Sequence, residues 1–177
     1  MDPRLGRLNE PHIGPLTDLV NRMRARGYRV LDFDPKDGGC NARALFLLHT
    51  PGPEAKNSGF VSRDNLDPTA QNMGRAMDDA KLQRCDVLLW NAVPYIAATT
   101  DDRTQNARAD TQALIGKLPN LRAIVFCGFE AIKVAPYLQI PFEVRSFFTF
   151  HTGAQAYNHH REKIHYTFRQ VAQHLGQ

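Results

Sequence analysis

Residues 44–52 read Ala-Leu-Phe-Leu-Leu-His-Thr-Pro-Gly, which is a run of five apolar residues followed by a polar turn. A continuous apolar run of this length is typical of a strand that is covered on both faces, as in a parallel sheet. Similar stretches follow further along the chain. We therefore predict four strands, at residues 44–48, 86–90, 121–126 and 142–148.

Helical patterns separate these strands. Leu16, Leu19, Val20 and Met23 have the i, i+3, i+4, i+7 spacing of an amphipathic helix. Comparable signals predict helices over residues 15–26, 67–81, 104–118 and 160–175, with a short helix after Gly128. Strands that alternate with helices favour parallel strands with right-handed crossovers. The predicted fold class is therefore α/β, a doubly wound three-layer sandwich with a four-stranded, mainly parallel sheet.

The composition indicates an ordinary globular protein, with 42% hydrophobic and 23% charged residues. A length of 177 residues suits one core, so we predict a single domain over residues 1–177. No apolar run approaches the roughly 20 residues of a membrane span, and residues 1–15 lack a signal-peptide core, so we expect a cytoplasmic protein without membrane contact. The three cysteines are widely spaced and predict neither a disulfide framework nor a metal site.

The net charge of +4 and the excess of arginine over lysine favour an anionic partner. A solvated arginine-rich surface explains the same excess equally well. A more specific signal comes from the sheet, because open α/β sheets bind ligands at the carboxyl ends of their strands. Three polar loops follow predicted strands there, at residues 49–60, 91–95 and 151–158. We predict that these three loops build the functional pocket.

These loops resemble the motifs of the uracil-DNA glycosylase superfamily, in the same order, over about residues 45–165. Residues 48–52 (Leu-His-Thr-Pro-Gly) stand at its strand-end motif, and residues 90–94 (Trp-Asn-Ala-Val-Pro) are similar to its strand-then-Asn motif. Residues 151–154 (His-Thr-Gly-Ala) stand where the superfamily has His-Pro-Ser-Pro. The resemblance implies a monomeric DNA repair glycosylase without cofactor or metal. It would flip deoxyuridine out of DNA, hydrolyse its N-glycosidic bond, release free uracil and leave an abasic site.

The resemblance also implies roles for single residues. The Asn91 amide would read the O4 and N3–H edge of uracil, and Phe60 would stack on the flipped base. His151 would donate a hydrogen bond to O2 of the departing uracil, where negative charge develops. The backbone of His49 and Thr50 would add contacts to the base. Each residue also has a structural alternative: Asn91 as a turn cap, Phe60 as a core residue and His151 as a structural histidine.

Contacts with DNA are expected from the segment that follows His151. Gln155 stands roughly at the family's wedge residue, which fills the gap left by the extruded nucleotide. Tyr157, His159 and Arg161 would contact phosphates. A solvated loop leading into the last helix is the alternative for this segment.

The first motif departs from the superfamily. His49 and Thr50 stand where its members usually have an Asp, Asn or Glu that activates water. His49 could act as the base, or Glu54, Asn57 or Asp64 could fold in, or stabilisation of the leaving group could carry most of the rate. We expect the last, with help from His49.

Two further differences bear on the substrate. Gly52 stands where uracil-specific members have a tyrosine that blocks the thymine methyl group. The atypical first motif also leaves two alternatives open. The enzyme could release another deaminated or damaged base such as hypoxanthine, or the chain could be a catalytically silent nucleic-acid-binding domain of the same fold.

Overall fold

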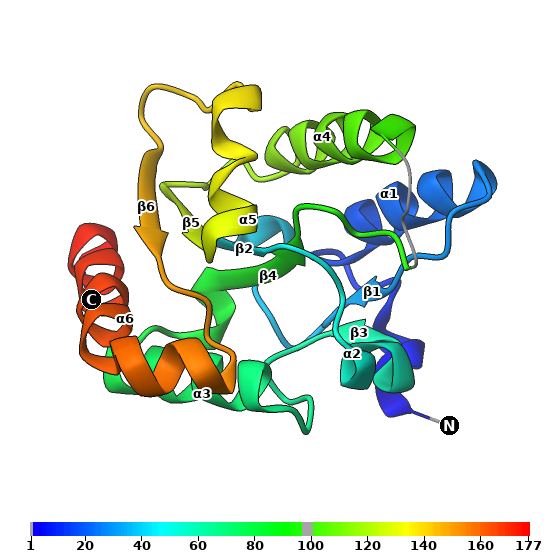
Figure 1. The fold of residues 1–177 in the computed structure, drawn as a ribbon. Helices are drawn as coiled ribbons and strands as arrows, with labels where there is room; N and C mark the ends of the chain where they lie inside the picture. Colours follow the sequence, from blue (N-terminus) through cyan, green and yellow to red (C-terminus); the bar gives the residue numbers. More distant parts are fainter. Residues whose placement is uncertain (1, 97–100) are drawn as a thin grey trace.

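A four-stranded parallel sheet forms the middle layer of the computed structural model, which describes residues 2–96 and 101–177 (Figure 1). Its strands lie in the order β4-β2-β5-β6, and every neighbouring pair is parallel. Their bounds are β2 (Ala44–Leu48), β4 (Val87–Asn91), β5 (Ala123–Cys127) and β6 (Arg145–Thr149). The predicted α/β three-layer architecture is confirmed.

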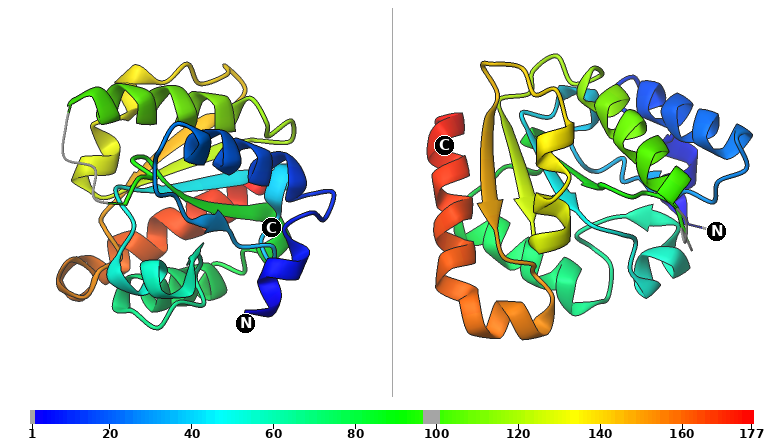
Figure 2. Two further views of the ribbon diagram at one scale, coloured as in Figure 1. Left: turned by 90° about the vertical axis from the view of Figure 1, so that its right-hand side faces the viewer. Right: turned by 45° about the horizontal axis from the view of Figure 1, so that its top comes forward.

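Helices cover both faces of this sheet (Figure 2). On one face α1 (Gly14–Ala25) packs against α4 (Asp101–Ile115), and on the other α3 (Pro68–Asp79) packs against α6 (Ala154–Leu175). Two shorter helices are α2 (Pro53–Ser58) and α5 (Phe129–Ile132). Single 3-10 turns occupy Pro3–Arg7, Gly39–Asn41, Arg84–Asp86 and Ala135–Tyr137. No helix in the described part of the chain is long and apolar enough to cross a membrane.

A second, two-stranded parallel sheet joins β1 (Asp32–Phe33) to β3 (Phe60–Val61). The strand pattern does not predict it, because two-residue strands are too short to show a period. Its effect on the first loop is large. The segment over residues 49–60, predicted as one loop, contains α2 and ends inside a strand.

The segment after β6 also differs from prediction. The last helix begins at Ala154 instead of about residue 160, so the third loop is only residues 151–153 long. Gly153 precedes the helix with extended backbone (φ −60°, ψ 154°), and His160 has a non-helical φ of −129° that kinks it. The strand before it begins at Arg145 and not at residue 142, because residues 142–144 form a turn and bend.

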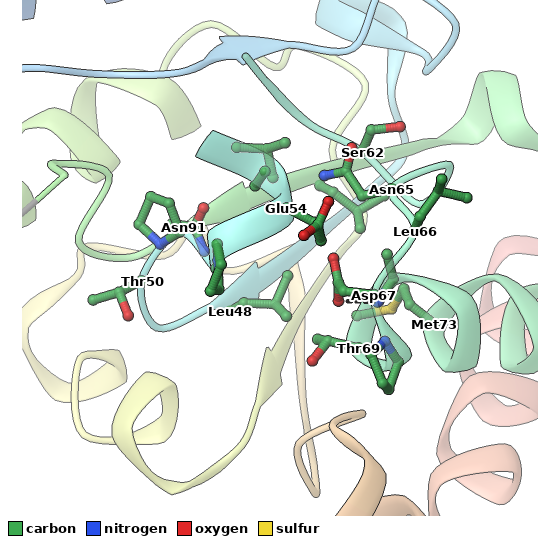
Figure 3. A pocket seen from close by; sticks show the side chains of 18 of the residues that line it. Leu48, Thr50, Glu54, Ser62, Asn65, Leu66, Asp67, Thr69, Met73 and Asn91 are labelled. Atoms are coloured by element: carbon green, nitrogen blue, oxygen red, sulfur yellow. Dashed lines mark hydrogen bonds between the residues drawn. The ribbon is translucent and has the colours of Figure 1, made fainter. Parts of the chain in front are cut away.

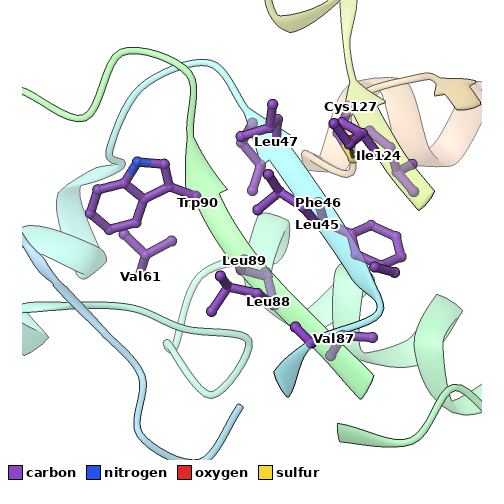
Figure 4. Packing of buried hydrophobic residues seen from close by; sticks show 14 of the residues in the cluster. Leu45, Phe46, Leu47, Val61, Val87, Leu88, Leu89, Trp90, Ile124 and Cys127 are labelled. Carbon is purple, nitrogen blue, oxygen red and sulfur yellow. Dashed lines mark hydrogen bonds between the residues drawn. The ribbon is translucent and has the colours of Figure 1, made fainter. Parts of the chain in front are cut away.

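The core lies on both faces of β2, β4 and β5, whose residues are all buried (Figure 4). Phe33 stacks on Trp90 with ring centroids 3.7 Å apart, and Phe46 meets Phe168 on the helical layer at 5.0 Å. Apolar side chains therefore hold the strands from both sides, and the four carboxyl ends emerge together at one edge.

Candidate functional site

A cavity of about 740 Å³, here the main cavity, lies at this edge of the sheet (Figure 3). Thr50 after β2, Asn91 at the end of β4 and His151 after β6 all line it. Residues of α2 and of the start of α3 complete the wall. The three loops predicted from sequence each contribute a side chain to one cavity.

Asn91 is held in the hydrogen-bond ladder of the sheet. It pairs with Leu48, and the next two amides continue the ladder: Ala92 N–H donates to the Leu48 carbonyl at 2.7 Å and Val93 N–H to the His49 carbonyl at 2.9 Å. The residue is 4% exposed. Because backbone groups close this turn, the Asn91 side chain is not needed as its cap, and its amide is a buried polar group on the cavity wall.

The loop that follows Asn91 is anchored at its far end. Tyr95 is buried, its ring stacks on Tyr28 with centroids 3.9 Å apart, and its hydroxyl donates to the Asp110 carboxylate. Burial and this hydrogen bond both raise the pKa of the Tyr95 hydroxyl. Residues 92–95 are thus fixed at both ends of this segment.

His151 has a defined tautomer. Its Nδ1 accepts a hydrogen bond from the Gly153 backbone N–H at 2.9 Å, so a neutral ring carries its proton on Nε2. Burial lowers the pKa of His151, while the nearby Asp67 carboxylate acts to raise it. The lowered pKa favours the neutral ring, which offers one N–H donor at Nε2.

Two glycines make room for this ring. A Cβ atom at Gly153 would lie 2.8 Å from His151 Nδ1, and one at Gly128 would lie 2.9 Å from His151 Cβ. Gly128 also has a φ of +92°, which L side chains rarely adopt. Larger residues at either position would displace the imidazole.

The loop after β6 is fastened to α3. Thr152 is fully buried, and its hydroxyl donates to the Thr69 carbonyl at 3.0 Å. The Asn72 side-chain amide donates to the Thr152 carbonyl at 2.9 Å. These two bonds fix the residue next to His151 against the helix whose first turn lines the main cavity.

His49 is placed differently from its neighbour Thr50. Its side chain is not among the described residues that line the main cavity. Burial lowers the pKa of His49, and the charges that act on it belong to Glu130 and Lys133 on and beside α5. The structure therefore does not bring the imidazole of His49 to the cavity, where a base would be required.

Phe60 also stays away from the cavity wall. Its pairing with Asp32 in the small sheet leaves it 1% exposed, and the Arg4 guanidinium lies 4.2 Å from its ring centroid. Val61 and Ser62, the next two residues, line the cavity instead. The predicted stacking surface is thus covered by a cation from the N-terminal 3-10 turn.

Two carboxylates line the main cavity, Glu54 and Asp67. Glu54 was one of the candidates from sequence. Of the other two, Asn57 is exposed on α2, and Asp64 is tied to Arg84 at 2.7 Å and Lys36 at 2.9 Å, which lower its pKa to about 2. Neither is among the lining residues.

Asp67 is predicted from the sequence only at the start of the helix over residues 67–81, with no part in the site. Its Oδ1 does cap α3, accepting the Ala70 N–H at 3.0 Å, but the residue also lies on the wall and acts electrostatically on His151. The sequence did contain an indication of this second role. Asp67 precedes a predicted helix whose first turn lies at the carboxyl edge of the sheet, where ligands of such folds bind. Gly52 lines the cavity as well, with no atom within 4 Å of an added Cβ.

The expected DNA contacts divide into two groups. Gln155, His159 and Arg161 are exposed on the first part of α6. Tyr157 is buried, and its hydroxyl is hydrogen-bonded to His165 Nε2 at 2.7 Å. The Tyr157 hydroxyl therefore points inward, away from a phosphate at the surface.

Within residues 2–96 and 101–177, no three His, Cys, Asp or Glu side chains are placed to hold a metal ion. Comparison with known proteins gives no match, either to a protein-family model or to a curated protein.

Proposed function

We propose that this chain is a uracil-DNA glycosylase. The observation that carries the proposal is the meeting of Thr50, Asn91 and His151 at one cavity, although they lie 41 and 60 residues apart in sequence (91 − 50 and 151 − 91). The cavity volume of about 740 Å³ falls in the range of small-molecule sites and admits a nucleobase.

Recognition of uracil falls to Asn91. A fixed side-chain amide offers one donor to O4 and one acceptor to N3–H. Cytosine presents the opposite pattern at these two positions, so it would leave buried polar groups unpaired. The burial of Asn91 supports this role, because unpaired groups cost most where water is excluded.

Departure of the base falls to His151. The C1′–N1 bond breaks with its electron pair moving to uracil, and negative charge grows on O2. The Nε2–H of a neutral His151 would donate to that oxygen, in a site where the ring is oriented beforehand by Gly153. Such preorganised donors are usually the largest catalytic contribution.

Activation of water falls to Asp67 in place of His49. The His49 side chain is not among the described residues that line the cavity, whereas Asp67 lines it. Both residues act electrostatically on His151, so the place of Asp67 on the cavity wall is what distinguishes the two. An ionised Asp67 would orient the water that adds to C1′ and accept its proton, and its charge would stabilise the cationic sugar. By that point uracil has already left C1′ as the anion held by His151.

The test uses end-labelled oligonucleotides with one deoxyuridine, single-stranded and paired with G or A. We expect uracil release and an alkali-labile abasic site. No release from any of these substrates at stoichiometric enzyme would contradict the proposal. Parallel substrates with hypoxanthine or thymine test the alternative base, since Gly52 leaves the wall open where a 5-substituent could lie.

A further inference from the structure

A second cavity of about 440 Å³ lies between α3 and α6. Asn72 and Arg75 line it from α3, and Tyr157, Asn158 and Arg161 line it from α6. Two arginines and the exposed Asn158 thus surround one hollow, and no described carboxylate is among its lining residues. This set of donors is suited to an anion.

Hydrogen bonds connect this second cavity to the main one. Arg75 Nη1 donates to Asn72 Oδ1 at 3.0 Å, and Asn72 Nδ2 donates to the Thr152 carbonyl at 2.9 Å, next to His151. The cavities also share elements, because Thr69 and Met73 of α3 line the main cavity while Asn72 and Arg75 line the second. Arg75 therefore lies within one helical turn of residues that line the main cavity, and Arg161 lies about two turns along α6 from Ala154, which also lines it.

The charges of the arginine pair are not neutralised within the described residues. The two acids one turn beyond Arg75 are paired elsewhere: Asp78 lies 3.7 Å from Arg63, and Asp79 binds His165 at 3.0 Å and Arg169 at 2.7 Å. Tyr157, whose hydroxyl is engaged by His165, also lines the cavity, and the Arg161 guanidinium lies 5.9 Å from the centroid of its ring. Tyr157 thus lies beside two arginines that form no ion pair with a described carboxylate among residues 2–96 and 101–177.

We propose that Arg75 and Arg161 together hold one backbone phosphodiester of DNA, beside the nucleotide that enters the main cavity. The planar guanidinium fork matches phosphate oxygens bidentately, and phosphate contacts fix the register of a protein on its DNA. The proposal deepens the proposed function and rests on it for the choice of DNA as partner. It adds Arg75, on a different helix from the residues expected to contact phosphates.

The experiment measures binding of fluorescein-labelled duplex without uracil, by anisotropy, between about 50 and 200 mM salt. Arg75→Gln and Arg161→Gln should each weaken binding about tenfold at low salt and lower the salt slope by about 1. The double variant should lose little more than either single, because both side chains hold the same phosphate. The matched control is Arg22→Gln, which removes an exposed charge from α1 on the opposite face of the sheet.

An affinity and slope of Arg75→Gln equal to those of Arg22→Gln would overturn the proposal. It would also fall if Arg75→Gln loses affinity only for inorganic phosphate and keeps it for the duplex. Thermal unfolding checks each variant, and Arg75→Lys, which keeps the charge but not the fork, should retain part of the affinity.

Uracil-free DNA separates this proposal from the proposed function. If the wild type releases uracil but Arg75→Gln binds duplex normally, the phosphate site is wrong and the glycosylase stands. If Arg75→Gln loses affinity but no variant or wild type releases a base, the glycosylase is wrong and the phosphate site stands.

Discussion

At the scale of single residues, two histidines with similar chemistry have different surroundings. Burial lowers the pKa of both His49 and His151, so both favour the neutral ring. Only His151 lines the main cavity, with Nδ1 engaged by Gly153 and Nε2 left as donor. Position at the carboxyl end of a strand therefore does not by itself decide which side chain lines the cavity.

Asn91→Ala tests the reading of uracil. Truncation removes one donor and one acceptor from the buried cavity wall. The O4 and N3–H groups of bound uracil then lose their partners, and each unpaired group costs about 1–3 kcal/mol. We expect single-turnover uracil release to fall about 100-fold or more, while duplex without uracil binds as before. Asn57→Ala, which removes an exposed amide outside the cavity, should leave the rate unchanged. An equal rate in both variants would count against Asn91.

Asp67→Asn separates the charge of Asp67 from its cap. Asparagine caps a helix as well as aspartate, so the free energy of unfolding should stay the same. The single-turnover rate should fall about 100-fold or more, because the carboxylate that orients water is lost. Glu54→Gln, at the other carboxylate of the cavity, is the comparison. If the single-turnover rate falls in Glu54→Gln but not in Asp67→Asn, the residue that orients the water is Glu54 and not Asp67.

The sequence predicted best those cavity residues that stand directly at the end of a strand. Asn91 and Thr50 are within two residues of a buried strand, and the sheet alone brings them to one edge. Phe60 was not predictable in this way. Its orientation depends on pairing with Asp32 and on the guanidinium of Arg4, contacts far away in sequence that no local pattern encodes.

At the scale of elements, the apolar runs located β2, β4 and β5, because burial on both faces leaves a continuous signal. The edge strand β6 is only partly buried, and its predicted start was three residues too early. The ends of elements were less predictable. The first turns of α6 carry polar residues, and this composition predicted a loop over residues 151–158. The segment is nevertheless helical from Ala154. What fixes this start is tertiary, since Thr152 is bound to Thr69 and Asn72 on α3.

Gly153→Ala tests the junction of β6 and α6. The backbone at Gly153 suits alanine, but the new Cβ would lie 2.8 Å from His151 Nδ1 and push the ring aside. We expect kcat to fall about 100-fold, as for small misplacements of catalytic groups, with the fold retained. The pH profile and the nitrogen NMR signals of His151 should shift as well. Gly74→Ala in α3, where the added Cβ meets nothing closer than 4.0 Å, is the control, and unchanged His151 signals in Gly153→Ala would refute the idea.

At the scale of the whole molecule, a buried charge network ties the N-terminal segment to the back of the site. Asp34 is fully buried and accepts hydrogen bonds from Arg4 at 3.0 Å, Arg84 at 3.1 Å and the Ser62 hydroxyl. Ser62 lines the main cavity. The 3-10 turn at the N-terminus thus supports the cavity from behind, through charges that must stay paired when buried.

Asp37 makes this network sensitive to pH. It is buried beside Arg84 at 3.0 Å, and burial raises its pKa from 3.8 to about 7. The folded protein therefore binds a proton more tightly than the unfolded chain, so this group's contribution to stability is lost as pH rises from about 4 to about 7. Asp37→Asn should flatten that decline, measured as the urea unfolding free energy at several pH values. An unchanged pH dependence would show that Asp37 is ionised throughout.

The bonds from Ala92 and Val93 to the carbonyls of Leu48 and His49 also have a consequence for motion. Amides in a ladder between buried strands such as β2 and β4 exchange with solvent deuterium only when the sheet opens, whereas short surface helices open locally. We expect Ala92 and Val93 to exchange as slowly as the core of β2 and β4, and residues 53–58 of α2 to exchange much faster. Fast exchange at Ala92 would contradict this. Slow exchange at Ala92 and Val93 with fast exchange in α2 would mean that a nucleobase enters the cavity beside a flexible α2 and binds against a rigid strand end.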